Sequence, residues 1–194
     1  MANVMLSDRE LEMVTNAELI LTKNRIIQKV MELFGEVSAS AQTILANGLL
    51  KDLPEVQAIG PKISKGEQYQ ELPWVMLDYP RLFSNQHVLA IRCFFWWGNY
   101  VSVVLHLKGD YLEKHRAALE ASIWAEGTLF DTGQDEWNND LMHADFQPIQ
   151  QIPAAVWQER SYLRIATKIP LREWDHIESL LINQYQYLNQ RLTT

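Results

Sequence analysis

The sequence predicts a single α+β domain, 1–194, with an antiparallel sheet of about four to six strands, N-terminal helices, a middle helix and a long C-terminal helix. Apolar residues recur at helical spacing near both ends of the chain. Two strand-like runs flank Gly98-Asn99, and residues 161–169 alternate in polarity along their length. Together these patterns favour helices packed on a central antiparallel sheet.

The N-terminal region predicts two helices. Residues 7–10 match a capping box, in which the hydroxyl of Ser7 and the carboxylate of Glu10 satisfy free amides at the start of a helix. Apolar residues follow at helical spacing as far as Phe34, and we expect Gly35 to end this helix. A second helix is expected over 38–50.

The central hairpin is the most informative part of the sequence. Gly98-Asn99 between the runs 88–97 and 100–107 predicts a two-residue type II′ turn, because glycine takes the positive φ at the first position. This register pairs Ile91 with His106 and places Arg92 on the opposite face. Both faces are nearly all apolar, so we expect them to be covered by helices on one side and by more helix, a closed-over cavity or another subunit on the other.

The flanking segments complete the predicted domain. The apolar run 73–79 reads as a strand that closes at Asp78-Tyr79-Pro80, and a middle helix is expected from Asp110 with Leu112, Leu119 and Ile123 on its buried side. Residues 131–140 predict a long, solvated acidic loop. Residues 161–169 predict a strand near the sheet edge with Arg164 and Lys168 on its exposed face, and the final helix follows Pro170.

Composition excludes several classes of protein. A formal net charge of −7 without a dense basic patch argues against nucleic acid as a partner. The single cysteine, Cys93, rules out an internal disulfide framework. Residues 1–8 lack the pattern of a signal peptide, and polar residues interrupt the apolar stretch 88–107, so we expect a soluble, cytoplasmic protein that does not enter membranes.

Motifs that carry chemistry are absent or incomplete in the sequence. Asp131-Thr132-Gly133 is similar to the active-site turn of aspartic proteases, but one copy supplies only one of the two carboxylates, and a surface turn explains it more simply. A calcium loop counted from Asp131 would need glycine and glutamate where Glu136 and Met142 stand. The five histidines lack metal-ligand spacing. We therefore assign no catalytic residue, metal or cofactor.

The ionisable groups of the hairpin suggest a candidate site. Arg92 and His106 are the only such groups there, and a buried arginine needs a partner, for which Asp78 is the candidate. One interpretation is a structural ion pair in the core. The other is an apolar pocket in which Arg92 fixes an anionic group. On the second interpretation the ligand-binding residues are Arg92, Trp74, Phe94, Trp96, Asp78 and His106.

Two hypotheses for function stay open. The first is a non-catalytic intracellular module that binds a small ligand, anionic ligands included, or a protein partner, with a homodimer through the second apolar face as one form. The alternative is an enzyme with a site near Arg92, His106 and Asp78. The predicted register places Arg92 and His106 on opposite faces, which favours the first hypothesis.

Overall fold

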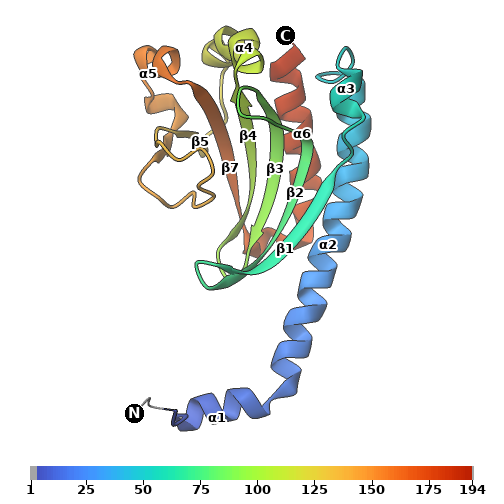
Figure 1. Ribbon diagram of the computed structural model, residues 1–194, viewed down its shortest axis with the longest axis vertical. Coiled ribbons are helices and arrows are strands. Elements are labelled where there is room, and N and C mark those ends of the chain that lie inside the picture. The colour runs from blue at the N-terminus through green and yellow to red at the C-terminus, as the bar shows by residue number, and fades with distance from the viewer. Residues whose placement is uncertain (1–3, 194) are drawn as a thin grey trace.

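A computed structural model describes residues 4–193 and confirms the α+β fold class (Figure 1). Within these residues seven strands, one more than the upper expectation, form an antiparallel sheet in the order β1-β2-β3-β4-β7-β5-β6. The elements in chain order are α1 (Asp8–Thr15), α2 (Ala17–Ala46), α3 (Pro54–Gln57), β1 (Lys62–Tyr69), β2 (Leu72–Phe83), β3 (Val88–Trp96), β4 (Tyr100–Lys108), α4 (Asp110–Ala121), β5 (Thr128–Asp131), β6 (Phe146–Pro148), η1 (Ile149–Gln151), α5 (Ala154–Glu159), β7 (Tyr162–Pro170), η2 (Leu171–His176) and α6 (Ile177–Thr193).

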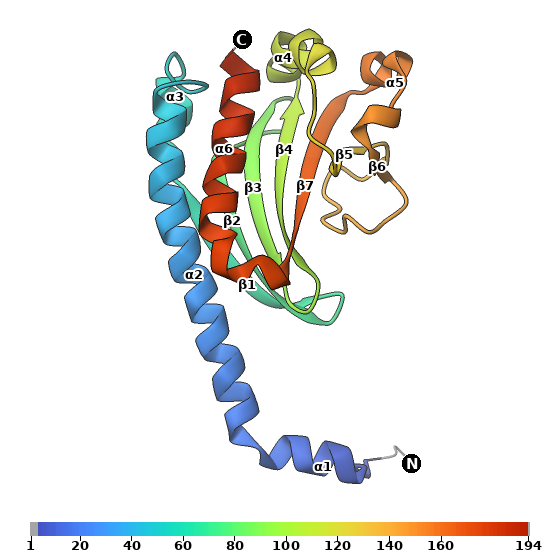
Figure 2. The same ribbon diagram turned by 180° about the vertical axis from the view of Figure 1, so that it is seen from behind.

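The long helices α2 and α6 lie side by side on one face of the sheet (Figure 2). Both are amphipathic, with buried residues three or four positions apart facing the strands. The buried stripe of α2 contains Ile27, Val30, Phe34, Val37, Ala41 and Leu45, and that of α6 contains Ile177, Leu181, Tyr185, Leu188 and Leu192. The larger hydrophobic core of the molecule lies between these helices and the sheet.

The helix boundaries near the N-terminus differ from the prediction. The capping box at Ser7 is present, but the first break comes at Asn16, whose side chain accepts a hydrogen bond from the amide of Glu18. The expected end at Gly35 is wrong, because α2 continues through it to Ala46. A glycine inside a helix costs about 1 kcal/mol, and the buried stripe on both sides of Gly35 outweighs that cost.

The β3–β4 turn is one residue longer than predicted. Trp96 pairs with Tyr100, the amide of Asn99 donates to the carbonyl of Trp96 at 3.0 Å, and Gly98 takes a φ of 74°. The predicted pairing of Ile91 with His106 is therefore wrong, since His106 pairs with Ala90. The slip of one residue moves His106 to the face that carries Arg92, so the two side chains share a face.

Both faces of the hairpin are covered, as the sequence predicts. Every residue of β3 except Arg92, and every residue of β4 except Lys108, is buried. The second face is covered by this chain itself: by residues 132–145, which we call the covering loop, and by the β1–β2 hairpin. The apolar cluster on this face contains Phe94, Trp96, Tyr100, Val104, Leu141, Phe146 and Ala166, with Tyr69, Leu72, Trp74, Met76 and Leu129 against it. A homodimer is not needed to shield this face.

Two strands differ from the prediction. β7 lies between β4 and β5 rather than at the edge, so Arg164 is buried while Lys168 stays exposed. β2 does not close at Asp78, because it passes through a register shift before Arg81 and continues to Phe83. Both differences arise from pairing with neighbours that sequence periodicity does not reveal.

The middle helix also differs in detail. Gly109 precedes its first residue, Asp110, and no side-chain cap forms there. Leu112 and Leu119 are buried as expected, whereas Ile123 follows the helix and is 89% exposed. Among residues 4–193, no helix combines the length and apolar character that crossing a bilayer requires.

Candidate functional site

Asp78 and Arg92 form the ion pair that the sequence suggested. They face each other across β2 and β3, with Arg92 Nε 2.7 Å from Asp78 Oδ1 and Nη2 3.2 Å from Oδ2. This two-pronged geometry matches the guanidinium fork to the carboxylate. Nη1 of Arg92 also donates to Asn139 Oδ1 of the covering loop at 3.4 Å. The guanidinium of Arg92 is therefore engaged by groups of this chain.

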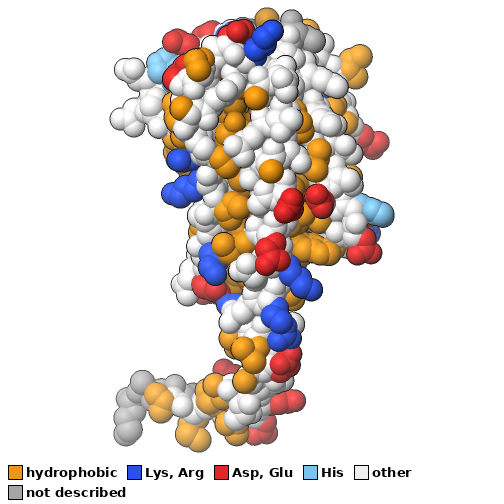
Figure 3. Space-filling view, turned by 90° about the vertical axis from the view of Figure 1, so that its right-hand side faces the viewer, with side chains coloured by type: hydrophobic (Ala, Val, Ile, Leu, Met, Phe, Trp, Pro, Cys, Tyr) orange, Lys and Arg blue, Asp and Glu red, His pale blue; other side chains and the backbone are white. Residues whose placement is uncertain are grey.

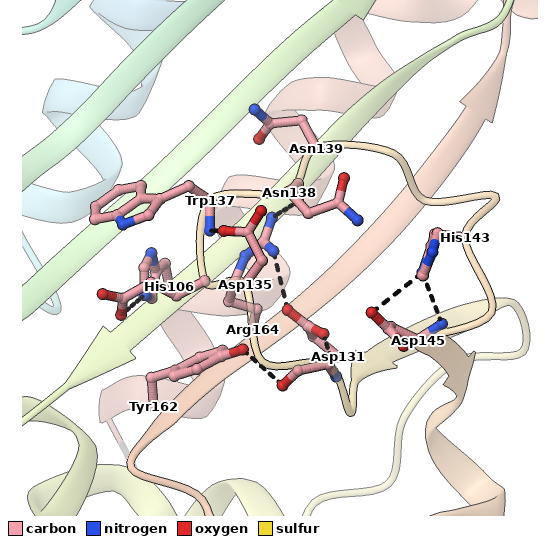
Figure 4. A network of polar contacts seen from close by, with 12 residues as sticks. His106, Asp131, Asp135, Trp137, Asn138, Asn139, His143, Asp145, Tyr162 and Arg164 are labelled. Carbon is pink, nitrogen blue, oxygen red and sulfur yellow. Dashed lines mark hydrogen bonds and ion pairs between the residues drawn. The ribbon is translucent and has the colours of Figure 1, made fainter.

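A second buried ion pair, between Arg164 and Asp131, was not expected. Arg164 Nη1 lies 2.9 Å from Asp131 Oδ2, and each side chain is 2% exposed. Nη2 of Arg164 donates to the carbonyl of Asn138 (Figure 4). Asp131 also accepts a hydrogen bond from the amide of Gly133. Both oxygens of its carboxylate therefore bind groups of this chain, unlike the paired catalytic carboxylates of an aspartic protease. The interpretation of Arg164 as a solvated side chain is wrong.

The covering loop is fastened to the sheet by further hydrogen bonds. The hydroxyl of Tyr100 accepts from the amide of Leu141 at 2.7 Å and donates to the carbonyl of Asn139 at 3.0 Å. The hydroxyl of Tyr69 accepts from the amide of Asn139 at 3.1 Å. Tyr162 donates to the carbonyl of Gly133 at 2.8 Å. The expected solvated loop is instead part of the packed structure, although its outer residues remain exposed.

His106 lies beneath the loop, close to Glu136. Its Nε2 is 3.5 Å from Glu136 Oε2, and both atoms are buried without a hydrogen-bond partner among the residues that the structure describes. Burial, reinforced by the positive charges of Arg164, Arg92 and Lys108, lowers the pKa of His106 from 6.5 to about 3. His106 is therefore neutral at pH 7. Glu136 is held by Lys108, whose Nζ lies 2.8 Å from its Oε1.

Arg92 and His106 line one small cavity together. Its volume is about 10 Å³, and its walls are Phe83, Ala90, Arg92, Val104, His106, Glu136 and Arg164. A space of this size fits about one water molecule and excludes an organic anion. The structure thus brings the predicted polar residues together, which the predicted register did not allow, but leaves little room between them.

The predicted aromatic residues form a separate group on the same face. The rings of Trp74 and Phe94 have centroids 6.1 Å apart, and the indole of Trp96 donates to the carbonyl of Tyr69 at 3.3 Å. The ring of Tyr69 packs edge-on against Phe94 and Trp96 at 5.3 and 5.2 Å. These rings fill space in an apolar cluster and do not line the cavity at Arg92.

Nucleophilic catalysis by Cys93 and metal binding can also be judged from the structure. Cys93 faces the helices, where its thiol lies 3.8 Å from the hydroxyl of Tyr185 and complete burial raises its pKa to about 12. It lies on the opposite face from His106, so the two cannot form a nucleophile and base. Within residues 4–193, no three side chains of the His, Cys, Asp and Glu types are grouped to hold a metal ion.

A surface that sequence reasoning missed lies at the N-terminus. Every residue from Val4 to Leu21 is exposed, and we call this segment the arm. Of the thirteen exposed large hydrophobic residues in the described part of the chain, nine lie in the arm: Val4, Met5, Leu6, Leu11, Met13, Val14, Leu19, Ile20 and Leu21. Figures 1 and 3 show the arm extending beyond the body, with hydrophobic side chains along it. An apolar concentration of this kind usually marks an interaction site.

An apolar hollow lies next to the base of the arm. It has a volume of about 430 Å³ and is lined by Ile26 of α2, Phe95, Trp97 and Gly98 of the β3 end, and Leu171 and Trp174 of η2. Ile26 lies only five residues beyond the last residue of the arm, so the hollow and the arm form neighbouring apolar surfaces.

The length of α2 explains why the arm is left uncovered. Its 30 residues span about 45 Å at 1.5 Å per residue, and its first buried residue is Ile27, so the ten residues before Ile27 extend about 15 Å past the core. The sheet therefore does not cover the first turns of α2. The helical pattern through Leu11, Val14 and Ile20 was visible in the sequence, but periodicity does not tell whether an apolar stripe meets its own sheet or another molecule.

Comparison of the chain with protein-family models, with curated proteins and with solved structures finds no match. Two places in the structure therefore bear on its function: the polar network under the covering loop, and the arm with its hollow.

Proposed function

We propose that this chain is a non-catalytic protein-binding module, and that its binding surface is the arm together with the hollow at its base. The observation that carries the proposal is the concentration of nine exposed large apolar side chains in residues 4–21. An amphipathic helix with apolar residues at i and i+3 or i+4 is a common anchor in protein recognition. Leu11 and Val14 have this spacing in α1.

The energetics of the arm agree with this role. Full burial of an aliphatic side chain contributes about 1.5–3 kcal/mol, and the nine side chains are between 46% and 83% exposed. Covering them would supply a substantial driving force for association, even after the cost of fixing the partners. The arm is attached to a well-packed part of the molecule, because the rest of α2 is held on the sheet by its buried residues from Ile27 to Leu45.

The network under the covering loop weighs against a small-ligand site and against an enzymatic site at Arg92. Arg92 is engaged by Asp78 and Asn139, and Arg164 by Asp131, so a small anion would have to displace carboxylates that already hold these cations. The cavity of about 10 Å³ does not admit a substrate. A ligand site or an enzymatic site at Arg92, His106 and Asp78 would require the whole covering loop to move.

A photo-crosslinking experiment tests the proposal. A benzophenone amino acid is placed at Ile20 in the arm or, as a matched control, at Ile123, which is an exposed isoleucine of the body. The full chain is irradiated in the cells that produce it. We expect covalent adducts with protein, heavier than the 22.6 kDa chain, from position 20 and not from position 123. Absence of adducts from position 20, or equal yields from both positions, would overturn the proposal.

A further inference from the structure

The chain carries both an exposed apolar helix and an apolar hollow near its base. We propose that the partner of the arm is a second copy of this chain: two arms pair antiparallel about a two-fold axis near Ile20, and each α1 reaches the hollow of the other copy. The inference rests on the protein-binding role proposed above. In a two-fold dimer the same patch serves both subunits, so a surface that contains an anchor and a place for it is self-complementary.

The charges along the helices favour this arrangement. Residues 8–18 contain four acidic residues, Asp8, Glu10, Glu12 and Glu18, against one arginine, Arg9. Residues 19–31 contain three basic residues, Lys23, Arg25 and Lys29, and no acidic residue. When α1 of one copy reaches the hollow of the other, its acidic side chains lie beside the basic segment that contains Ile26 of that hollow, so opposite charges meet.

Contacts within the chain use only part of this charge. Arg25 lies 2.5 Å from Glu18, and Lys23 lies 2.8 Å from Glu67 of β1. Asp8, Glu12 and Lys29 are exposed on the surface. Figure 3 shows lysine and arginine side chains where the arm joins the body, with hydrophobic side chains below them. These charged side chains therefore lie on the surface, where the arm of a second copy can contact them.

The break between the two helices indicates where the axis lies. The helix breaks at Asn16, and α1 runs across the direction of α2 (Figure 1), so the two copies meet along the first turns of α2. Successive residues of a helix point about 100° apart, and we place the exposed Ile20 at the axis, where it meets Ile20 of the other copy. The same symmetry lets α1 of each copy lie across the base of the other arm, near Ile26, which lines the hollow.

The apolar area is of the order that a stable dimer needs. A fully exposed aliphatic side chain offers on the order of 100 Å², so nine side chains, roughly half exposed or more, offer at most about 500 Å² per arm. Two arms offer at most about 1,000 Å², to which the hollows and flanking surfaces add, and specific complexes bury about 1,200–2,000 Å². The occupant of the hollow would be the Leu11 and Val14 side chains, one turn apart on α1.

The mass of the protein in solution, measured by sedimentation equilibrium, tests the inference. The wild-type chain is expected to sediment at twice 22.6 kDa. Ile20→Glu and Ile20→Lys each place like charges at the axis, so each variant alone should be monomeric. An equal mixture of the two should recover a dimer, because opposite charges then meet. Ile20 is exposed and outside the core, so both variants should fold, and Ile123→Glu serves as the matched control that stays dimeric.

The outcomes separate this inference from the proposed function. A monomeric wild type, dimeric Ile20→Glu and Ile20→Lys variants, or a mixture that stays monomeric would each overturn self-pairing. If the wild type is monomeric while a crosslinker at position 20 still captures a different protein, self-pairing is wrong and the protein-binding role stands. If the wild type is monomeric and position 20 captures nothing, both are wrong.

Discussion

Arg92 and His106 lie on the same face of the β3–β4 hairpin and line the same cavity beneath Glu136. Arg92 is held by Asp78, and the positive charges of Arg92 and Arg164 both act on the buried imidazole. The covering loop thus closes over a network of buried charges that belongs to the stability of the fold. The arm, in contrast, contributes little to that stability, and the predictions below separate the two.

Removing one partner of the buried Asp131–Arg164 pair should strongly destabilise the protein. In Asp131→Asn the guanidinium of Arg164 stays buried without its counter-charge, which costs about 3–5 kcal/mol of unfolding free energy. Urea unfolding measures this loss. The control is Glu173→Gln, which removes the exposed ion pair with Arg172 and should cost about 0–1 kcal/mol. Equal losses in the two variants would contradict a buried pair.

The buried His106 should make the protein less stable as the pH falls. Its pKa is about 3 in the folded state and 6.5 when free, so the unfolded state takes up the proton first, and stability is lost as the pH falls from about 6.5 toward 3. Between pH 7 and pH 5 this loss is about 2 kcal/mol. Urea unfolding at both pH values measures it.

Variants isolate the contribution of His106 from that of the other titrating groups. His106→Gln, or His106→Phe if the amide is poorly tolerated, should lose about 2 kcal/mol less than the wild type over this pH interval. His176→Gln, which alters an exposed histidine, should follow the wild type. His115, whose burial lowers its pKa to about 4, acts in the same direction and cancels in the comparison. Parallel curves for wild type and His106→Gln would show that His106 is not buried as a neutral group.

The thiol of Cys93 should be unreactive in the folded protein. Complete burial raises its pKa to about 12, and the thiolate is the reactive form. A thiol reagent such as DTNB should therefore react only as fast as the protein unfolds, and urea should release one equivalent per chain. Rapid labelling under native conditions would place Cys93 at the surface.

Truncations in the two parts of the N-terminal region should have very different effects on stability. Phe34→Ala opens a cavity under α2 and should cost about 3–5 kcal/mol, because Phe34 is fully buried. Leu11→Ala in α1 removes an exposed side chain and should change the unfolding free energy by less than about 0.5 kcal/mol. The comparison is made in an Ile20→Lys background, so that association does not contribute. A large loss in Leu11→Ala would show that α1 packs on its own body.

The sequence predicted the fold class and the two-sided burial of the central hairpin, because these follow from apolar periodicity within each strand. It did not predict the register, because a Gly-Asn pair suits a two-residue turn as well as the three-residue connection that begins at Trp97. A slip of one residue leaves the alternation within β3 unchanged and reverses which residues of β4 accompany it. That reversal decided whether Arg92 and His106 share a face.

The burial of Arg164 and the position of the arm depended on contacts between distant segments. Arg164 alternates with apolar residues in β7 as a solvated residue would, and only the covering loop, which brings Asp131 and Asn138 over it, makes it a core residue. Likewise, Leu11 and Ile20 follow a helical stripe that continues into the core at Ile27. Their exposure depends on where the sheet ends beneath α2, and the helical pattern of the sequence does not contain that information.

Hydrogen exchange at the backbone amides of residues 17–25 tests most directly whether the arm is an interface occupied by a second copy. These amides belong to the exposed first turns of α2, which contact the body through the Lys23–Glu67 ion pair and bury no side chain, so in a monomer they should open and exchange readily. If two arms pair, the protection of these amides rises with protein concentration and is lost in Ile20→Glu at every concentration, while β3 and β4 stay protected throughout. Exchange of 17–25 that is the same in dilute and concentrated wild-type protein, and the same in Ile20→Glu, would contradict it.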